Sequence, residues 1–341
     1  MASEGAVREP SPWKVQAKRW FPRIRILASI GMVVALLEWV DLDSLHIKWG
    51  TSTIAFFLGG LCFTILGIVL SAFRWQRVLA AMDLPLRLWP LLDTYLASQF
   101  LSNFLPSSIG GDALRVTRLS ANSDEGRAAG EPEAPAAFAS VVLDRMSGWL
   151  ILPLLCLAGL FINPSLLHLG RSSRAAIALS VVTLVALGVV VWAASSARVG
   201  GRLAGHENWL RFMGAIHLGL ARIWKKPAAA LQVLGASIVY QLAIVTAGFL
   251  AAKAIGIHLG PTAMLAFIPA VAIVQVLPIS VGGLGLREGA FAVFLHPLGV
   301  ETGQAIALGL CMYGMHLVAS LLGAPSFAVG RRPPRRAVGV G

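Results

Sequence analysis

Three short segments of this sequence carry charged side chains beside or within long apolar stretches. The charged residues are Asp112, Arg115, Asp144, Arg145, Arg287 and Glu288. Arginine offers a planar fork of donors that suits a phosphate group. A helix that begins after a glycine turn adds free N–H groups and the positive end of its dipole. The residues therefore fit an anionic phosphate ligand, and the open alternative is that neighbouring acids and bases neutralise one another and hold helices together.

Two of these segments are copies of one motif. Residues 105–115 read LPSSIGGDALR, and residues 277–287 read LPISVGGLGLR. Proline ends an incoming helix, and a glycine pair permits a tight turn. Irregular backbone survives at membrane depth only where protein or a water-filled cavity shields it. Two broken helices in corresponding halves indicate a transporter binding site, whereas two ordinary Pro/Gly-rich loops are the alternative.

The elements that position these residues must lie in a membrane. Of 341 residues, 57% are hydrophobic and 13% are charged, against about 45–50% and 25% in soluble domains. This composition excludes an ordinary soluble enzyme and a disordered chain. The net charge of +12 lies in short patches between apolar runs, which favours loop topology and acidic lipid head groups over nucleic acid. Neither the three cysteines nor the seven histidines show a metal-ligand spacing, so we expect no metal and no cofactor.

The apolar runs predict an all-α polytopic protein with six full spans and two shorter hairpins. The spans are 26–40, 53–73, 136–161, 175–194, 228–251 and 303–329. The short segments 88–105 and 262–277 end at prolines, and 290–298 follows the second glycine turn. We interpret 26–40 as a retained span rather than a signal peptide, because no small-residue cleavage site follows it.

The distribution of Lys and Arg predicts the topology. With both motifs treated as hairpins, 22 of the 28 basic residues lie in the N-terminal tail, 74–135, 198–226 and the C-terminal tail. The positive-inside rule then places both termini in the cytoplasm. Three spans separate the hairpins, so they enter from opposite faces as an inverted repeat. The same sides follow whether the hairpins are re-entrant or fully spanning.

The predicted organisation is one membrane domain between two basic tails. Residues 1–25 and 331–341 form the tails, and 26–330 contain pseudo-repeats at about 26–161 and 175–330. The linker 198–226 is basic and carries an apolar stripe at helical spacing. Such a segment suits the membrane surface, and the alternative is a helix packed against the protein itself.

The motifs around residues 103–115, 144–148 and 278–289 resemble the lysylphosphatidylglycerol synthetase transmembrane-region family, whose members are called flippase-like domain proteins. The likeness runs from about Ile26 to Gly323, with the motifs in family order. It implies a lipid flippase fold in which these motifs line the lipid path. Synthetase members also carry a soluble aminoacyl-transfer domain, and we expect this chain to lack it and to make no lysyl-lipid by itself.

The resemblance transfers candidate lipid-binding residues to this sequence. In the first motif they are Asn103, Pro106, Ser108, Gly110, Gly111, Asp112 and Arg115. In the second they are Asp144, Arg145 and Gly148, although many members have Glu at the position of Asp144. In the third they are Pro278, Ser280, Gly282, Gly283, Gly285, Arg287 and Glu288.

The sequence thus predicts a multi-pass inner-membrane protein that moves or presents an anionic phospholipid or lipid-linked phosphate. We expect membrane lipids as partners, no nucleic acid, and a possible biosynthetic enzyme partner. One rival is an enzyme or enzyme subunit using a lipid-phosphate donor, with Asp112 or Asp144 as base. The other is a non-transporting scaffold. No catalytic residues are predicted, since no nucleophile stands beside a His and a carboxylate.

Overall fold

The computed structural model describes residues 50–104, 109–120, 134–195, 214, 216, 217, 219, 226–277, 280 and 283–329. The secondary-structure elements in these ranges are helices. The α-helices are α2 (Thr51–Ala81), α3 (Leu88–Phe104), α4 (Ile109–Ser120), α5 (Ala134–Ile162), α6 (Arg171–Ser195), α9 (Pro227–Ala254), α10 (Pro261–Gln275), α11 (Leu286–Leu295), α12 (Thr302–Ser320) and α13 (Ala324–Val329). Short 3-10 turns are η3 (Pro164–His168), η4 (His296–Leu298) and η5 (Leu321–Gly323).

Five helical stretches are long and apolar enough to cross a bilayer. They are Thr51–Ala81, Ala134–Ile162, Arg171–Ala194, Pro227–Ala254 and Thr302–Ala328. The shortest of them, 24 residues, is about 36 Å long at 1.5 Å per residue, which exceeds a hydrocarbon core of about 30 Å. These helices confirm predicted spans two to six. The predicted span at 26–40 lies outside the described residues. The chain is therefore a multi-pass α-helical membrane protein.

Helix α2 is longer than the sequence predicted, because it continues past Arg74 to Ala81. The prediction ended the span at Phe73 and assigned Arg74 to a basic loop, which is wrong. Arg74 is buried within the helix, and Trp75 and Leu79 are fully buried beyond it. A buried charge of this kind is tolerated when it has an ion-pair partner. The helix ends before Asp83, whose φ is 66°.

Each repeated motif interrupts a helical hairpin. In the first, α3 ends two residues before Pro106, and α4 begins at Ile109. In the second, α10 ends at Gln275, and Gly283 and Gly285 adopt φ of 77° and 81° in the turn, a region that favours glycine. The following helix begins at Leu286 rather than at the predicted 290, because the backbone N–H of Gly285 donates to the Glu288 carboxylate and caps it.

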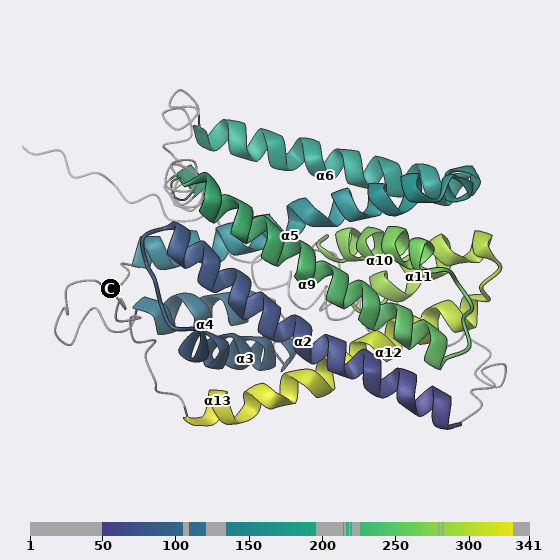
Figure 1. Ribbon diagram of the computed structural model, residues 1–341, viewed down its shortest axis with the longest axis horizontal. Helices are drawn as coiled ribbons and strands as arrows, with labels where there is room; N and C mark the ends of the chain where they lie inside the picture. The colour runs from purple at the N-terminus through teal and green to yellow at the C-terminus, as the bar shows by residue number, and fades with distance from the viewer. Residues whose placement is uncertain are drawn as a thin grey trace, which may run out of the picture.

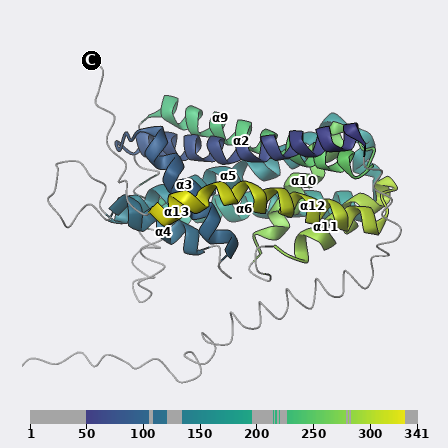
Figure 2. The ribbon, with the colours of Figure 1, turned by 90° about the horizontal axis from the view of Figure 1, so that it is seen from below.

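The helices of the two halves pack in corresponding pairs. Helices α2 and α9 lie side by side and run in opposite directions, and each is followed by its hairpin and then by a long helix (Figure 1). Helix α5 packs on the hairpin helix α10 of the other half, while α12 and α13 pack on α3. The α3–α4 hairpin lies toward one end of the molecule and α10–α11 toward the other (Figures 1 and 2). Corresponding contacts of this kind are what an inverted repeat predicts.

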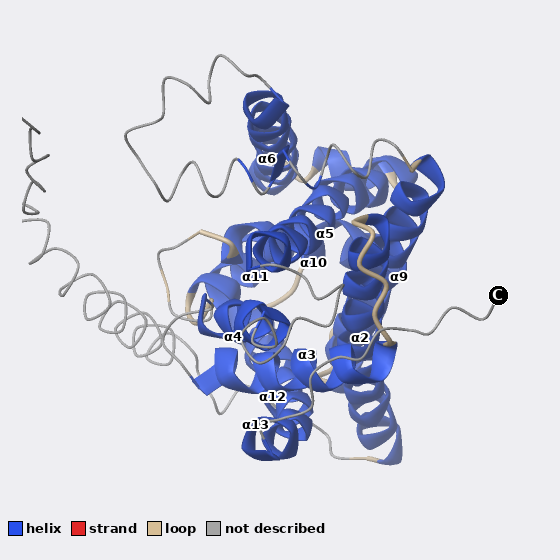
Figure 3. Cartoon of the chain, turned by 90° about the vertical axis from the view of Figure 1, so that its left-hand side faces the viewer, coloured by secondary structure: helices blue, strands red, loops and turns tan. Residues whose placement is uncertain are grey.

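Two buried clusters form the core. One joins α10 and α11 to α5 and α9 and includes Phe267 and Phe291. The other joins α2 to α3 and includes Trp75 and Leu91. Helix α6 packs chiefly on α5 and stands at the edge of the bundle (Figure 3), with Val182 and Trp192 exposed. Apolar side chains on the outer face of such a helix suit lipid rather than water.

Most of the predicted amphipathic linker 198–226 lies outside the described residues. Of its apolar stripe, Ile216 is described, and it is fully buried in a cluster with Val142 of α5. The adjacent His217 places Nδ1 3.0 Å from the carbonyl oxygen of Ala194 at the end of α6. At this position the stripe therefore packs against the protein, as in the alternative interpretation of the linker.

Candidate functional site

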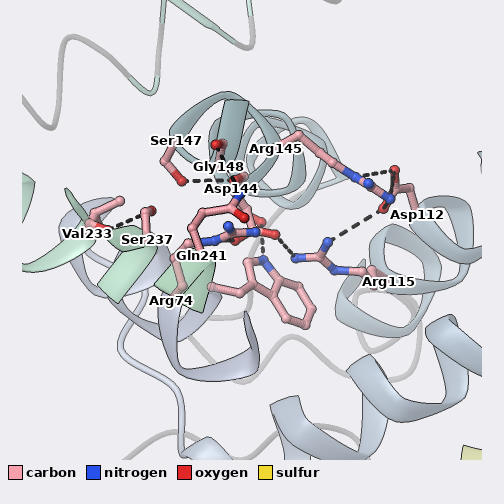
Figure 4. A network of polar contacts seen from close by, with 12 residues as sticks. Arg74, Asp112, Arg115, Asp144, Arg145, Ser147, Gly148, Val233, Ser237 and Gln241 are labelled. Atoms are coloured by element: carbon pink, nitrogen blue, oxygen red, sulfur yellow. Dashed lines mark hydrogen bonds and ion pairs between the residues drawn. The ribbon is translucent and has the colours of Figure 1, made fainter. Parts of the chain in front are cut away.

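A fully buried carboxylate joins three helices at the centre of the candidate site (Figure 4). Asp144 of α5 accepts a hydrogen bond from Nε of Arg74 on α2 at 2.7 Å and from Nη2 of Arg115 on α4 at 2.8 Å. The exposed fractions of these residues are 0% for Asp144, 4% for Arg74 and 1% for Arg115. Both carboxylate oxygens are thus occupied by guanidinium donors, and the residue links the hairpin to two spans.

A second carboxylate extends the network toward its more open side. Asp112, in the first turn of α4, receives Nε and Nη2 of Arg145, both at 3.0 Å. Nη1 of Arg115 lies 3.5 Å from the same carboxylate. The five charged side chains form one chain of contacts running Arg74, Asp144, Arg115, Asp112 and Arg145 (Figure 4).

One alternative left open by the sequence was that neighbouring charges neutralise each other, and for Asp144 and Arg145 this is wrong. Neighbours on a helix point about 100° apart, so Asp144 faces into the bundle and Arg145 faces α4. Each therefore pairs with a residue on another helix. The predicted contact of Asp112 with Arg115 is present but is the longest in the network.

Aromatic rings support the two buried guanidinium groups. Arg115 lies over the rings of Trp75 and Tyr95, at 4.2 and 4.8 Å from their centroids. Arg74 lies 5.0 Å from the centroid of Tyr240 on α9. Trp75 in turn donates its indole N–H to Oγ of Ser140 at 3.1 Å. Such ring contacts stabilise a desolvated guanidinium group and fix the direction in which its N–H donors point.

The network carries one more positive than negative charge, since three arginines share two aspartates. Its exposure is graded: the Asp144 side chain has none, Asp112 is 26% exposed and Arg145 is 42% exposed. In addition, Nε of Arg115 is buried without a hydrogen-bond partner among the described residues. The excess positive charge would stabilise an anion that reached the accessible end of the network, at Asp112 and Arg145.

The second motif builds a different arrangement. Arg287 donates from Nε at 3.0 Å and from Nη2 at 2.6 Å to Glu288, and its guanidinium lies 4.8 Å from the centroid of Tyr313. The other carboxylate oxygen of Glu288 caps α11, and Glu288 packs against Gly309 of α12. This pair is buried and neutral. Here the structure supports the alternative of charge neutralisation between neighbours.

The remaining candidate residues have mainly close-packing roles. Gly111 lies against Ser98 and Ser102 of α3, Gly148 lies against Arg74, and Gly283 lies against Gln275. Three other candidate residues of the motifs are half-buried or buried. They are Asn103, Gly110 and Ser280. Nδ2 of Asn103 is a buried donor without a partner in the described ranges. The candidates Pro106, Ser108, Pro278 and Gly282 lie outside the described residues.

Sequence reasoning missed Arg74 and Gln241, which lie in the site without belonging to a motif. Gln241 of α9 donates from Nε2 to the carbonyl oxygen of Gly148 at 3.4 Å. The signal for Arg74 was available: Trp75, Val78 and Leu79 continue the helical spacing of the span beyond it. For Gln241 no signal distinguished it from other polar residues within an apolar run.

A metal site is not formed by the described residues, in which no three His, Cys, Asp or Glu side chains come together. The donors of the network are guanidinium groups, and these bind anions rather than cations.

Fold and site together define a polytopic helical membrane protein with two interrupted hairpins and a buried arginine–aspartate network. The family described as the lysylphosphatidylglycerol synthase TM region matches residues 24–323, and the chain belongs to this family. No curated protein is similar enough to count as a relative. The expected family membership is thereby confirmed.

Proposed function

We propose that this protein translocates, or presents across the bilayer, an anionic phospholipid or lipid-linked phosphate. The observation that carries the proposal is the positive excess of the network that joins α2, α4 and α5. A charge inside the apolar region of a membrane is expensive and is usually kept for function. A phosphate group would neutralise the excess and would accept hydrogen bonds from the arginine side chains.

The position of the network fits a lipid path. Arg74 lies seven residues before the end of α2 and Asp144 ten residues after the start of α5, so these residues lie about 10 to 15 Å inside the helix ends. Helices of 31 and 29 residues are longer than a hydrocarbon core of about 30 Å, so this level corresponds to the boundary between the head groups and the apolar core of one leaflet. A lipid phosphate could reach it from that leaflet, as the first step of a path across the bilayer.

The state of the carboxylates favours transport over chemistry. The rival enzyme hypothesis uses Asp112 or Asp144 as a base. Both oxygens of Asp144 accept arginine donors, and Asp112 accepts the fork of Arg145. Neither carboxylate is placed to take a proton from a substrate without first breaking an ion pair. The proposal therefore assigns the protein no reaction of its own.

For its setting, we propose the inner membrane with both termini in the cytoplasm. The concentration of basic residues in one set of loops supports this orientation. The end of the molecule that carries the network would then face the cytoplasm, and membrane lipids would be the partners. An enzyme that makes or consumes the lipid is a further possible partner.

The direct test is transport in vesicles without other proteins. The full chain is reconstituted with fluorescent phosphatidylglycerol or phosphatidylcholine in both leaflets, and an impermeant reductant bleaches the outer pool. We expect the inner pool of phosphatidylglycerol to become bleachable with the protein present, and to do so faster than phosphatidylcholine. Arg145→Gln should slow the phosphatidylglycerol signal.

A matched control is Arg174→Gln, which removes an exposed arginine that contacts only the nearby Gly170 carbonyl oxygen among the contacts described for its side chain. Its transport should equal that of the wild type. Bleaching no faster than in protein-free vesicles, with correctly folded protein, would contradict the proposal. Equal rates for the two lipids would contradict its anionic selectivity.

A further inference from the structure

We infer that Asp112 is an exchangeable internal anion, and that the ligand's phosphate group displaces its carboxylate from between Arg145 and Arg115. The inference rests on the proposed function and names the binding site within it. The ligand class is a phosphate ester, whether carried by a lipid or by a small molecule.

The geometry around Asp112 is that of a bound oxyanion. Arg145 presents Nε and Nη2 to the carboxylate at 3.0 Å each, which is the two-pronged contact that arginine makes with carboxylate and phosphate alike. Nη1 of Arg115 lies 3.5 Å from Oδ1, the oxygen that Nη2 of Arg145 also contacts. A phosphate has more acceptor oxygens than the carboxylate it would replace, so it can engage both arginines at normal hydrogen-bond distance.

Two features beside the carboxylate leave room for a better acceptor. Nη1 of Arg115 makes only a long contact with it, at 3.5 Å. The first turn of α4, which contains Asp112, also presents the positive end of its helix. Asp112 therefore occupies a site whose capacity exceeds what one short carboxylate uses.

Asp112 and Asp144 differ in how easily their carboxylates can separate from their arginine partners. Asp144 has no exposure and is held on both oxygens, at 2.7 and 2.8 Å, so releasing it would leave Arg74 buried without a partner and Arg115 with only its longer contact to Asp112. Asp112 is 26% exposed, and its main partner Arg145 is 42% exposed. Breaking this pair returns the carboxylate to an accessible position. We thus assign Asp144 to holding the arginines and Asp112 to occupying the ligand site when the ligand is absent.

Exchange of anions would give the acid of this cationic site a role in the proposed transport. Without Asp112 the site would bind the ligand tightly and release it slowly. When the phosphate leaves, the carboxylate of Asp112 takes its place on the arginines. The guanidinium groups therefore have an anionic partner during both binding and release. Removing the carboxylate should therefore strengthen binding and slow turnover together.

The test measures binding and transport on the same full-length variants. Binding of dihexanoyl-phosphatidylglycerol and of sodium phosphate is measured by titration calorimetry in detergent. Asp112→Asn should bind the short-chain lipid about tenfold more tightly than the wild type, the scale of losing one partly exposed ion pair. Its translocation of fluorescent phosphatidylglycerol should be slower. Arg145→Lys should bind about tenfold more weakly, since it keeps the charge but loses the fork.

The matched control is Asp93→Asn, which removes an acid paired with Arg118 at 3.6 Å and 41% exposed. It should change neither quantity. The double variant Asp112→Asn with Arg145→Gln restores the charge balance and should bind no more tightly than the wild type. If Asp112→Asn does not fold, Arg145→Lys still tests the site, and wild-type affinity in that variant would overturn it.

The outcomes separate this inference from the proposed function. Unchanged or weaker binding by Asp112→Asn, with normal wild-type transport, would overturn the exchange and leave the transport proposal standing. A wild type that neither binds nor moves the lipid would overturn both. Binding of sodium phosphate alone would support an exchangeable anion site and would contradict a lipid as its ligand.

Discussion

At the scale of single residues, the two arginines that share one place in the repeated motif have different tasks. Arg115 reaches across to Asp144 on α5 and retains an unused buried donor within the described contacts. Arg287 directs two donors to its own neighbour Glu288. Although they share one place in the motif, Arg287 has a local partner for charge balance, whereas Arg115 belongs to the network that we propose binds the ligand.

Substituting each arginine by lysine separates these tasks. Arg115→Lys should lower lipid translocation by more than its loss of melting temperature explains, because lysine keeps the charge but cannot serve several acceptors as a fork. Arg287→Lys should lower translocation only in proportion to the folded fraction. Melting temperature and transport, measured on the same preparations, check both. If both variants lost transport equally, and by more than their loss of melting temperature explains, the two arginines would share one task.

The buried Asp144 should be the most sensitive single position. Asp144→Asn leaves Arg74 buried without a counter-charge and Arg115 with only its 3.5 Å contact to Asp112, and breaking such a buried pair costs about 3–5 kcal/mol. Asp112→Asn affects a partly exposed pair and should cost about 1 kcal/mol or less. Thermal melting in detergent should rank the variants in that order. A smaller loss for Asp144→Asn would mean that the arginines have other counter-charges.

The sequence could name most of the charged residues of the site but not their pairs. Asp112, Arg115, Asp144 and Arg145 were all predicted, because charges stand out within apolar runs. Their pairing depends on which helix faces which, and this is settled by packing between segments far apart in the chain. Arg74 was missed for a related reason: its charge resembled the edge of a span until its partner on α5 was visible.

At the scale of elements, the described spans were predictable to within a few residues apart from the end of α2 and the interruption of the last span. A run of apolar residues long enough to cross the bilayer has few alternatives to a helix. Helix ends were harder to predict, because the early start of α11 depends on the hydrogen bond from the backbone N–H of Gly285 to the Glu288 carboxylate. The last span is continuous in hydropathy but passes through the 3-10 turn η5 before Pro325 in α13.

Close contact between α5 and the hairpin helix α10 depends on Gly159. A Cβ at Gly159 would lie 2.5 Å from the backbone nitrogen of Ala266, so Gly159→Ala must push the two helices apart. Such overpacking costs about 1–3 kcal/mol, despite the better helix propensity of alanine. The melting temperature of the purified variant should fall accordingly, with a loss of transport if the hairpin shifts.

Gly188 provides the control for this substitution. It also lies within a long span, α6, but a Cβ there meets no described atom within 4 Å. Gly188→Ala should leave stability unchanged or raise it by up to about 1 kcal/mol from helix propensity alone. Equal effects of the two substitutions would show that the α5–α10 contact does not limit stability.

At the scale of the whole molecule, charge and packing point to the same arrangement by independent routes. The loops rich in Lys and Arg hold 22 of 28 basic residues by sequence. Removing the buried Arg74 and Arg115 from that set leaves 20, so the asymmetry survives the correction. The α2–α3 connection and the α5–α6 and α9–α10 connections lie at opposite ends of the bundle (Figure 1).

This arrangement predicts the side on which each connection reacts with an impermeant thiol reagent. Single cysteines are placed at the exposed positions Ser165, His258 and Arg87, after replacement of Cys62, Cys156 and Cys311. In intact cells, Ser165→Cys and His258→Cys should be labelled, and Arg87→Cys should be labelled only after the membrane is opened. The reason is that a span must separate the two ends of the bundle, and the basic end stays in the cytoplasm.

Labelling of Arg87→Cys alone would invert the orientation. Labelling of Ser165→Cys and Arg87→Cys from the same side would contradict the arrangement of the spans themselves.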